Sequence, residues 1–211
     1  MKLGVLFSGG KDSYLAMHIA SETHELSCLL TINSSNPDSW MFHTPAIEWT
    51  KLQSQSLKIP QIIQNTKGVQ DKELDDLFEL IEKGKNQYSI EGVVTGALAS
   101  TYQSTRIQKI CNDLNLWCFN PLWQMSQETL LEELIENNIE SIITGVAAEP
   151  FDDEWLGREI NLECINDLIK LKGSHRINPA GEGGEIESFV INAPLFNRGL
   201  EIIQSKIHYS N

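Results

Sequence analysis

A short glycine-rich segment between two apolar stretches constrains this chain more than any other feature. Residues 2–8 (KLGVLFS) have the apolar character of a buried strand, and a helix is expected over residues 11–22. The connecting segment consists of Ser8, Gly9, Gly10, Lys11, Asp12 and Ser13. A strand that turns through glycines directly into a helix is typical of α/β folds, which bind ligands at the carboxyl ends of parallel strands.

The connecting segment has the chemistry of a phosphate-binding loop. Glycines let backbone N–H groups approach an anion, and the start of the next helix adds free N–H groups and a positive dipole end. Lys11 contributes a positive charge, while Ser8 and Ser13 contribute hydroxyl donors. Asp12 can hold Mg²⁺ or cap the helix. The patterns GxxxxGK[ST] and GxGxxG are both absent, which excludes a Walker A loop and a dinucleotide fingerprint. A plain serine–glycine turn capped by Asp12 is the alternative.

Strand-like and helix-like stretches alternate along the rest of the chain, which predicts an α/β fold with a mostly parallel sheet. Further strands are expected at residues 26–33, 60–65, 92–96, 116–119 and 139–147. Further helices are expected at residues 45–57, 71–83, 100–114, 127–137 and 159–171. A composition shift near 172–187 precedes an expected strand pair at 186–192 and 201–208. We therefore predict an α/β body over residues 1–147 and a smaller C-terminal piece over residues 148–211.

Composition narrows the possible partners and compartments. A net charge of −13 argues against tight binding of a long nucleic acid. No apolar run approaches the roughly 18 residues that a membrane span needs, and residues 8–12 interrupt the apolar start before a secretory signal can form. Four cysteines without a CxxC pair argue against structural zinc or a disulfide framework. A cytoplasmic protein without membrane contact is expected.

Three other segments carry candidate site residues. Residues 94–106 (VTGALASTYQSTR) begin at the end of an expected strand, so Arg106 can reach the α-phosphate or remain a surface arginine. Residues 181–188 (GEGGEIES) place three glutamates and three glycines in a loop before a strand. These carboxylates can bind a cation, deprotonate an ammonium or hold Mg²⁺, and a solvated acidic turn is the alternative. Residues 155–158 (WLGR) are a further candidate, with packing at the rim as their alternative.

Together these segments resemble the diphthine–ammonia ligase family, a branch of the PP-loop (N-type) ATP pyrophosphatase superfamily. The resemblance rests on SGGKDS (8–13), SWMFHTP (39–45), VTGALASTYQSTR (94–106), NPLW (120–123), WLGR (155–158) and GEGGEIESFV (181–190). It implies adenylation by ATP of the carboxylate of diphthine, a modified histidine of elongation factor 2 that carries a trimethylammonium group. Ammonium then replaces AMP and gives diphthamide, so the products from ATP are AMP and pyrophosphate.

The resemblance also assigns residues. It implies a nucleotide-binding domain of the HUP type, which is Rossmann-like, over residues 1–147 and a small C-terminal substrate-binding region over residues 148–211. ATP would be the co-substrate, together with Mg²⁺, for which Asp12 is the candidate ligand. Residues 8–13 would bind ATP, and the catalytic residues would be Lys11, Asp12 and Arg106. Other nucleotide-site residues would be Gly96, Ser100, Tyr102, Gln103 and Arg106. The substrate side would hold His43, Glu182, Glu185 and Glu187. Glutamates suit a substrate with a fixed positive charge.

Some points stay open at the level of sequence. Ile186 and Ser188 stand where the family usually has an aromatic residue and threonine, which leaves the fine specificity open. His43 can be catalytic or can orient a loop. Two other functions compete with the ligase: a tRNA-modifying PP-loop enzyme and a non-catalytic nucleotide sensor. The acidic balance argues against the first, and the retained Lys11, Asp12 and Arg106 argue against the second.

Overall fold

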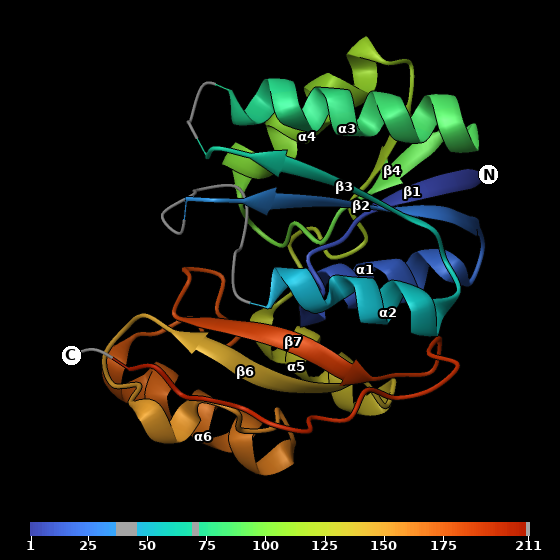
Figure 1. Cartoon of the computed structure of the whole chain (residues 1–211). Helices are drawn as coiled ribbons and strands as arrows, with labels where there is room; N and C mark the ends of the chain where they lie inside the picture. Colours follow the sequence, from blue (N-terminus) through green and yellow to red (C-terminus); the bar gives the residue numbers. More distant parts are fainter. Residues whose placement is uncertain (37–45, 69–71, 210–211) are drawn as a thin grey trace.

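Apolar, β-rich segments of the first 119 residues form one parallel sheet. The computed structural model describes residues 1–36, 46–68 and 72–209. The sheet has five strands in the order β3-β2-β1-β4-β5, and every neighbouring pair is parallel (Figure 1). The strands are β1 (Lys2–Leu6), β2 (Glu25–Ser34), β3 (Gln61–Thr66), β4 (Gly92–Val94) and β5 (Trp117–Phe119). The expected α/β fold with a parallel sheet is confirmed.

The strand order places a crevice beside β1. The chain runs from β1 outward through β2 to β3 and then returns to the other side of β1 with β4. The segments that follow β1 and β4 therefore leave the sheet in opposite directions from adjacent strands. Ligands of open α/β sheets bind at this switch in strand order, outside the carboxyl ends of the strands. The segments that meet there are residues 7–10 and 95–100.

Helices cover both faces of the parallel sheet. Helices α3 and α4 lie on one face, and α1 and α2 lie on the other (Figure 1). The helices are α1 (Lys11–Ser21), α2 (Thr50–Leu57), α3 (Glu73–Tyr88), α4 (Thr101–Asp113), α5 (Gln127–Glu136) and α6 (Leu162–His175), with short 3₁₀ turns at Ile47–Trp49 and Asp153–Trp155. The spacing of Leu77, Leu80 and Ile81 on α3 buries all three side chains. Burial of each such side chain contributes about 1.5–3 kcal/mol.

A second sheet lies on the far side of α1 and α2. It consists of β6 (Glu140–Val146) and β7 (Ile186–Asn192), which run antiparallel (Figure 1). The strand expected at 139–147 therefore forms, but it pairs with β7 and does not join the parallel sheet. A division of the chain after residue 147 falls between these two paired strands.

The prediction of a strand at residues 201–208 is wrong. Residues 201–209 have no regular secondary structure, and their side chains are exposed. A strand over residues 201–208 would have to pair with the free edge of β7. That edge is already used by the loop after β1, because the Val190 N–H donates to the Gly9 carbonyl at 2.9 Å. The alternating apolar residues of this segment, including Ile203, therefore face solvent.

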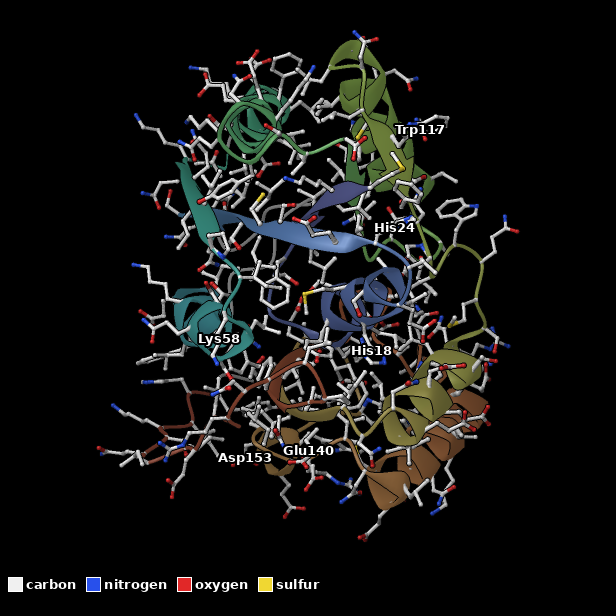
Figure 2. All side chains as sticks on the ribbon, turned by 90° about the vertical axis from the view of Figure 1, so that its right-hand side faces the viewer. His18, His24, Lys58, Trp117, Glu140 and Asp153 are labelled. Atoms are coloured by element: carbon white, nitrogen blue, oxygen red, sulfur yellow. The ribbon has the colours of Figure 1, made fainter. Side chains whose placement is uncertain are left out.

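Buried contacts join the two sheets through α1. One apolar cluster extends from Leu3 and Val5 on β1 through α1 to Val190 on β7. The Tyr14 hydroxyl accepts a hydrogen bond from the Leu195 N–H at 3.1 Å, and burial raises the pKa of Tyr14 to about 12. His18, labelled in Figure 2, bonds through Nε2 to Asn137 at the end of α5 over 3.1 Å. Across the described part of the chain, no helix is long and apolar enough to cross a membrane.

Candidate active site

A cavity of about 440 Å³ opens at the carboxyl ends of β1 and β4. One wall comes from the loop after β1, and a second comes from the start of α4. A third wall comes from the segment that enters β7. The cavity therefore lies between the parallel sheet and the second sheet. Its polar lining residues include Ser8, Gly10, Lys11, Asp12, Ser13, Gly96, Ser100, Gln103, Glu182, Glu187 and Ser188.

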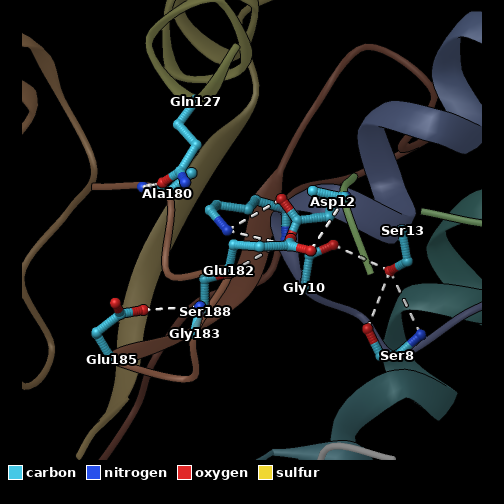
Figure 3. Close-up of polar contacts among 12 residues, drawn as sticks. Ser8, Gly10, Asp12, Ser13, Gln127, Ala180, Glu182, Gly183, Glu185 and Ser188 are labelled. Carbon is cyan, nitrogen blue, oxygen red and sulfur yellow. Dashed lines mark hydrogen bonds and ion pairs between the residues drawn. The ribbon is translucent and has the colours of Figure 1, made fainter. Parts of the chain in front are cut away.

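The loop after β1 closes through the Ser13 hydroxyl (Figure 3). This hydroxyl donates to the Gly10 carbonyl at 3.0 Å, accepts from the Ser8 N–H at 3.3 Å and lies 3.2 Å from the Ser8 hydroxyl. Gly10 is the N-cap of α1 and has no side chain that could cap the helix. The first turn of α1 therefore presents backbone N–H groups and a positive dipole end to the cavity. We call residues 8–13 the phosphate loop.

Lys11 and Asp12 form the charged pair of the phosphate loop. The Lys11 ammonium donates to both Asp12 carboxylate oxygens at 3.0 Å. The Lys11 side chain is only 2% exposed, whereas that of Asp12 is 38% exposed. Among the described residues Asp12 is the carboxylate that pairs with this buried ammonium, and the ammonium keeps a further N–H group that can attract another anion in the low local dielectric.

Strand β7 and helix α2 brace the phosphate loop from behind. The Lys11 N–H donates to the Ser188 hydroxyl at 3.2 Å. The Gly9 carbonyl accepts from the Val190 N–H at 2.9 Å and from the Gln53 side chain at 2.9 Å. Gly9 has a φ of 81°, and a Cβ at this position would lie 2.4 Å from the Gln53 amide oxygen. Only glycine fits here without a shift of the buried amide.

Gly96 brings the end of β4 against the phosphate loop. A Cβ on Gly96 would lie 2.8 Å from the Asp12 carbonyl carbon and from the Ser13 nitrogen. The Ser100 hydroxyl caps α4 by accepting from the Gln103 N–H at 3.3 Å. The close approach at Gly96 is what places Ser100 and Gln103 at the cavity.

Glu182 reaches the start of α4 from the opposite side. Its carboxylate accepts from the Ala99 N–H at 3.1 Å, which links residues 181–185 to the segment between β4 and α4. Burial raises the pKa of Glu182, and the nearby Asp12 charge acts in the same direction. Hydrogen bonds from Ala99 and Ser100 and the charge of Lys11 partly oppose this rise in pKa. A carboxyl group with a raised pKa suits proton transfer.

Glu187 lines the cavity, whereas Glu185 does not. The Glu185 carboxylate accepts from the Asn178 N–H at 2.9 Å, from the Asn178 amide at 2.7 Å and from the Gly183 N–H at 2.8 Å. These bonds close the turn that contains Gly181, which has a φ of 75°. Glu185 therefore shapes the loop in this structure.

Tyr102 and Arg106 do not line the cavity. The Arg106 guanidinium stacks over the Tyr102 ring with 3.4 Å between its carbon and the ring centroid, and it donates to the Tyr102 carbonyl at 3.1 Å. A contact with the α-phosphate would require Arg106 to leave this stack. His43 lies outside the described residues.

The WLGR segment is packed away from the cavity, at the second sheet. The Arg158 guanidinium lies 4.7 Å from the Trp155 ring centroid and pairs with Asp167 on α6 at 2.6 Å. Trp155 also meets Phe151 edge to face at 5.0 Å. Residues 155–158 thus pack against the second sheet and α6, in line with the packing alternative for this segment.

Two parts of the site were missed from the sequence. The first is the apolar end of the cavity, formed by Leu30, Ile32 and Ile107. The second is Gln53, which is fully buried behind the phosphate loop. A signal for Gln53 exists, because Thr50, Gln53 and Leu57 share the buried face of α2 at helical spacing. A polar amide on such a face requires internal partners.

Comparisons with known proteins show the family of this chain. The N-terminal domain of diphthamide synthase matches residues 1–117, and the C-terminal domain of diphthamide synthase matches residues 126–211. A curated diphthine–ammonia ligase from Rattus norvegicus is 34% identical, covering 98% of this chain and 84% of that protein. The corresponding protein from Homo sapiens is 31% identical, covering 98% of this chain and 85% of that protein.

A relative from Saccharomyces cerevisiae, also named diphthine–ammonia ligase, is 33% identical over 96% of this chain but only 35% of its own length. A crystal structure of a protein described as a subunit of tRNA methyltransferase from Methanocaldococcus jannaschii gives a TM-score of 0.47 at 16% identity. It covers 92% of this chain and 100% of that chain, and a likeness this distant supports no functional argument. The two domain matches and the full-length relatives show that this chain belongs to the diphthine–ammonia ligase family of carbon–nitrogen ligases.

Proposed function

We propose that this protein adenylates the diphthine carboxylate of elongation factor 2 with ATP and amidates it with ammonium. The observation that carries the proposal is one cavity lined from both sides. The phosphate loop reaches it from the parallel sheet, and Glu182 and Glu187 reach it from the segment that enters β7. An anion site and a cation site thus face each other, as the two charged reactants require.

The cavity orients ATP by its two chemically different ends. The apolar side chains of Leu30, Ile32 and Ile107 suit the adenine ring. The phosphate loop suits the outer phosphates, because the Lys11 ammonium and the first turn of α1 are positive. ATP bound in this direction places its α-phosphorus between the phosphate loop and the glutamates. That position is where an acceptor carboxylate can attack.

The proposed reaction has two steps. A diphthine carboxylate oxygen attacks the α-phosphorus, and the bond to the β,γ-pyrophosphate breaks. Lys11 and the backbone N–H groups stabilise the departing pyrophosphate. Ammonia then attacks the acyl carbon of the adenylate, and AMP leaves with the bonding electron pair. The proton that ammonium must lose can pass to Glu182, whose raised pKa makes its carboxylate a stronger base than an ordinary glutamate.

Asp12 is the residue that would hold Mg²⁺ beside the phosphates. Its carboxylate lines the cavity and is partly exposed. Within the described ranges, no three His, Cys, Asp or Glu side chains gather into a metal cluster. This fits Mg²⁺, which commonly uses one or two carboxylates together with substrate phosphates and water. Bound there, the ion would neutralise charge on the leaving pyrophosphate.

The glutamates suit the proposed acceptor. Diphthine carries a permanently cationic trimethylammonium group, which has no N–H to donate but which the Glu182 and Glu187 carboxylates can attract electrostatically. The partner would be elongation factor 2, and the proposal places the reaction in the cytoplasm. The two other functions weighed from the sequence are not favoured, since the full-length relatives are named as ligases that act on diphthine.

The test is incubation of the protein with ATP, ammonium and elongation factor 2 that carries diphthine. Mass measurement of the modified peptide should show the acid converted to the amide only when all components are present. Elongation factor 2 with an unmodified histidine is the matched control and should stay unchanged. An unchanged diphthine mass, with protein that binds ATP, would contradict the proposed substrate.

A further inference from the structure

Gln53 connects the phosphate loop to β7 and does not itself line the cavity. The side chain is fully buried on α2. Its amide nitrogen donates to the Gly9 carbonyl at 2.9 Å and to the Val190 carbonyl at 2.8 Å. The Val190 N–H donates to the same Gly9 carbonyl at 2.9 Å. The Gly9 carbonyl is therefore held by two donors, one from α2 and one from β7.

These two bonds fix the plane of the peptide between Gly9 and Gly10. In a trans peptide the carbonyl and the N–H point in opposite directions. With its carbonyl directed at Gln53 and Val190, this peptide directs the Gly10 N–H to the opposite side. Gly10 lines the cavity on that side, whereas Gly9 does not. The Gly10 N–H is thereby oriented toward the position of a bound phosphate.

A peptide between two glycines has little steric resistance to rotation. Gly9 has a φ of 81°, and neither residue has a Cβ that would restrict the alternatives. A rotated peptide would present a carbonyl oxygen to the phosphates in place of an N–H group. Two donors on the Gly9 carbonyl oppose this rotation, and the Val190 N–H alone would oppose it less.

We propose that Gln53 is a positioning residue for phosphate recognition, which keeps the Gly10 N–H directed at the nucleotide phosphates. This inference rests on the proposed function, since it takes the phosphate loop as the ATP site. Gln53 touches no phosphate and acts through the peptide that follows Gly9. Its effect should therefore fall on the phosphates of a ligand and spare the nucleoside.

The variant Gln53→Met tests this proposal because methionine has a similar length and volume but no donor. A matched control is Gln61→Met, since the Gln61 amide also donates to two acceptors, the hydroxyls of Thr31 and Thr50, at 2.8 and 2.9 Å. Gln61 lies on β3 and does not contact the phosphate loop. Dissociation constants for ATP and for adenosine are measured for both full-length variants and the unchanged protein, by calorimetry or ligand-observed NMR.

Gln53→Met should weaken ATP binding about tenfold, which corresponds to the loss of one well-formed hydrogen bond to an ionic group. Its affinity for adenosine should stay unchanged, and Gln61→Met should change neither affinity. Equal weakening of ATP and adenosine by Gln53→Met would show a merely structural role and overturn the proposal. Unchanged ATP binding would overturn it as well.

A second measurement needs no variant and applies even if Gln53→Met does not fold. In a crystal structure of the unchanged protein with ATP, the Gly10 N–H should donate to a phosphate oxygen while the Gly9 carbonyl stays bonded to Gln53. If the phosphates lie at the loop but the Gly9–Gly10 peptide is rotated, the proposed role of Gln53 is refuted while the proposed function stands. Nucleotide bound outside the cavity would refute the proposed function itself.

Discussion

The two loops that face each other across the cavity are built in different ways. In the phosphate loop Gly9, Lys11 and Ser13 are buried, and α2 and β7 brace the loop from behind. The opposite loop, residues 181–185, is more exposed and contains Gly181 and Gly184, both with positive φ. Its shape depends largely on its own Glu185 carboxylate, which bonds to Asn178 and Gly183.

This difference matches the two ligands. ATP is small and must be oriented to within a fraction of an ångström, which favours a loop fixed by buried hydrogen bonds. The acceptor arrives on another protein, so its side of the site must stay open to a large partner. We therefore expect changes at the phosphate loop to cause large losses in adenylation. Changes at the opposite loop should cause smaller losses, mainly in the use of the acceptor.

The largest effect is expected for Lys11→Met. Replacement of Lys11 by methionine removes the positive charge that stabilises the negatively charged departing pyrophosphate, so the adenylation rate should fall about 10²–10³-fold. Exchange of labelled pyrophosphate into ATP in the presence of the diphthine acceptor measures this step. Lys58→Met, on the surface at the end of α2, is the control and should keep the original rate. A normal rate for Lys11→Met would remove the phosphate loop from the mechanism.

Glu182→Gln should have the next largest effect, and it should distinguish use of the acceptor from binding of ATP. Loss of this carboxylate removes attraction for the cationic acceptor and an acceptor for the ammonium proton. We expect kcat/KM for the diphthine protein to fall about 10–100-fold, with ATP binding little changed. Glu154→Gln, on an exposed carboxylate outside the cavity lining, should leave both values unchanged. An equal loss in ATP affinity would contradict the assignment of Glu182 to the acceptor side.

A smaller effect is expected for Glu185→Gln. In the wild-type protein one Glu185 oxygen accepts from Asn178 and the other accepts from the Gly183 N–H. Glutamine replaces one of these oxygens by an NH₂ group, so one of the two sets of hydrogen bonds is lost. Unfolding in urea should show a loss of about 1–2 kcal/mol in stability. Steady-state kinetics should show a rise in KM for the acceptor with an unchanged KM for ATP. Glu132→Gln on α5 is the control, and equal effects on both substrates would show that Glu185 does more than shape its loop.

The smallest effect is the pH dependence of stability that Glu182 contributes. Burial raises its pKa in the folded protein, so the folded state binds its proton more tightly than the unfolded state does. The stabilising contribution is complete below the ordinary glutamate pKa of about 4.3 and is lost as the pH rises through the raised value. The free energy of unfolding, compared with that of Glu182→Gln, should therefore decrease over this window. A difference that increases with pH would contradict the raised pKa.

Local patterns in the sequence predicted the α/β fold and the strand, turn and helix around residues 8–13 well. The strand, glycine turn and helix of residues 2–22 depend on neighbours in the chain, so their positions could be inferred directly. The carboxyl-edge location of Gly96 and Ser100 followed from the same logic, because parallel strands end at one edge. The α3 helix was also identifiable from the spacing of Leu77 and Ile81.

Pairings between distant segments could not be predicted. Strand β6 has the apolar character of a parallel strand, yet it pairs antiparallel with β7, and 39 residues (147–185) separate the two strands in the chain. Nothing local in either strand distinguishes the two arrangements. The role of Gln53 also depends on a distant partner, Val190 on β7. At Arg106 a local contact was overlooked instead. The guanidinium stacks on Tyr102, four residues earlier on α4, and this contact competes with the expected contact to the α-phosphate.

In the proposed mechanism the phosphate loop holds the outer two phosphates of ATP while the adenylate group moves to the acceptor. The most direct test uses ATP labelled at the γ-phosphate, with ammonium and elongation factor 2 carrying diphthine. The label should appear in pyrophosphate, and AMP should form in equal amount to the amide. Label in orthophosphate, together with ADP, would contradict the account.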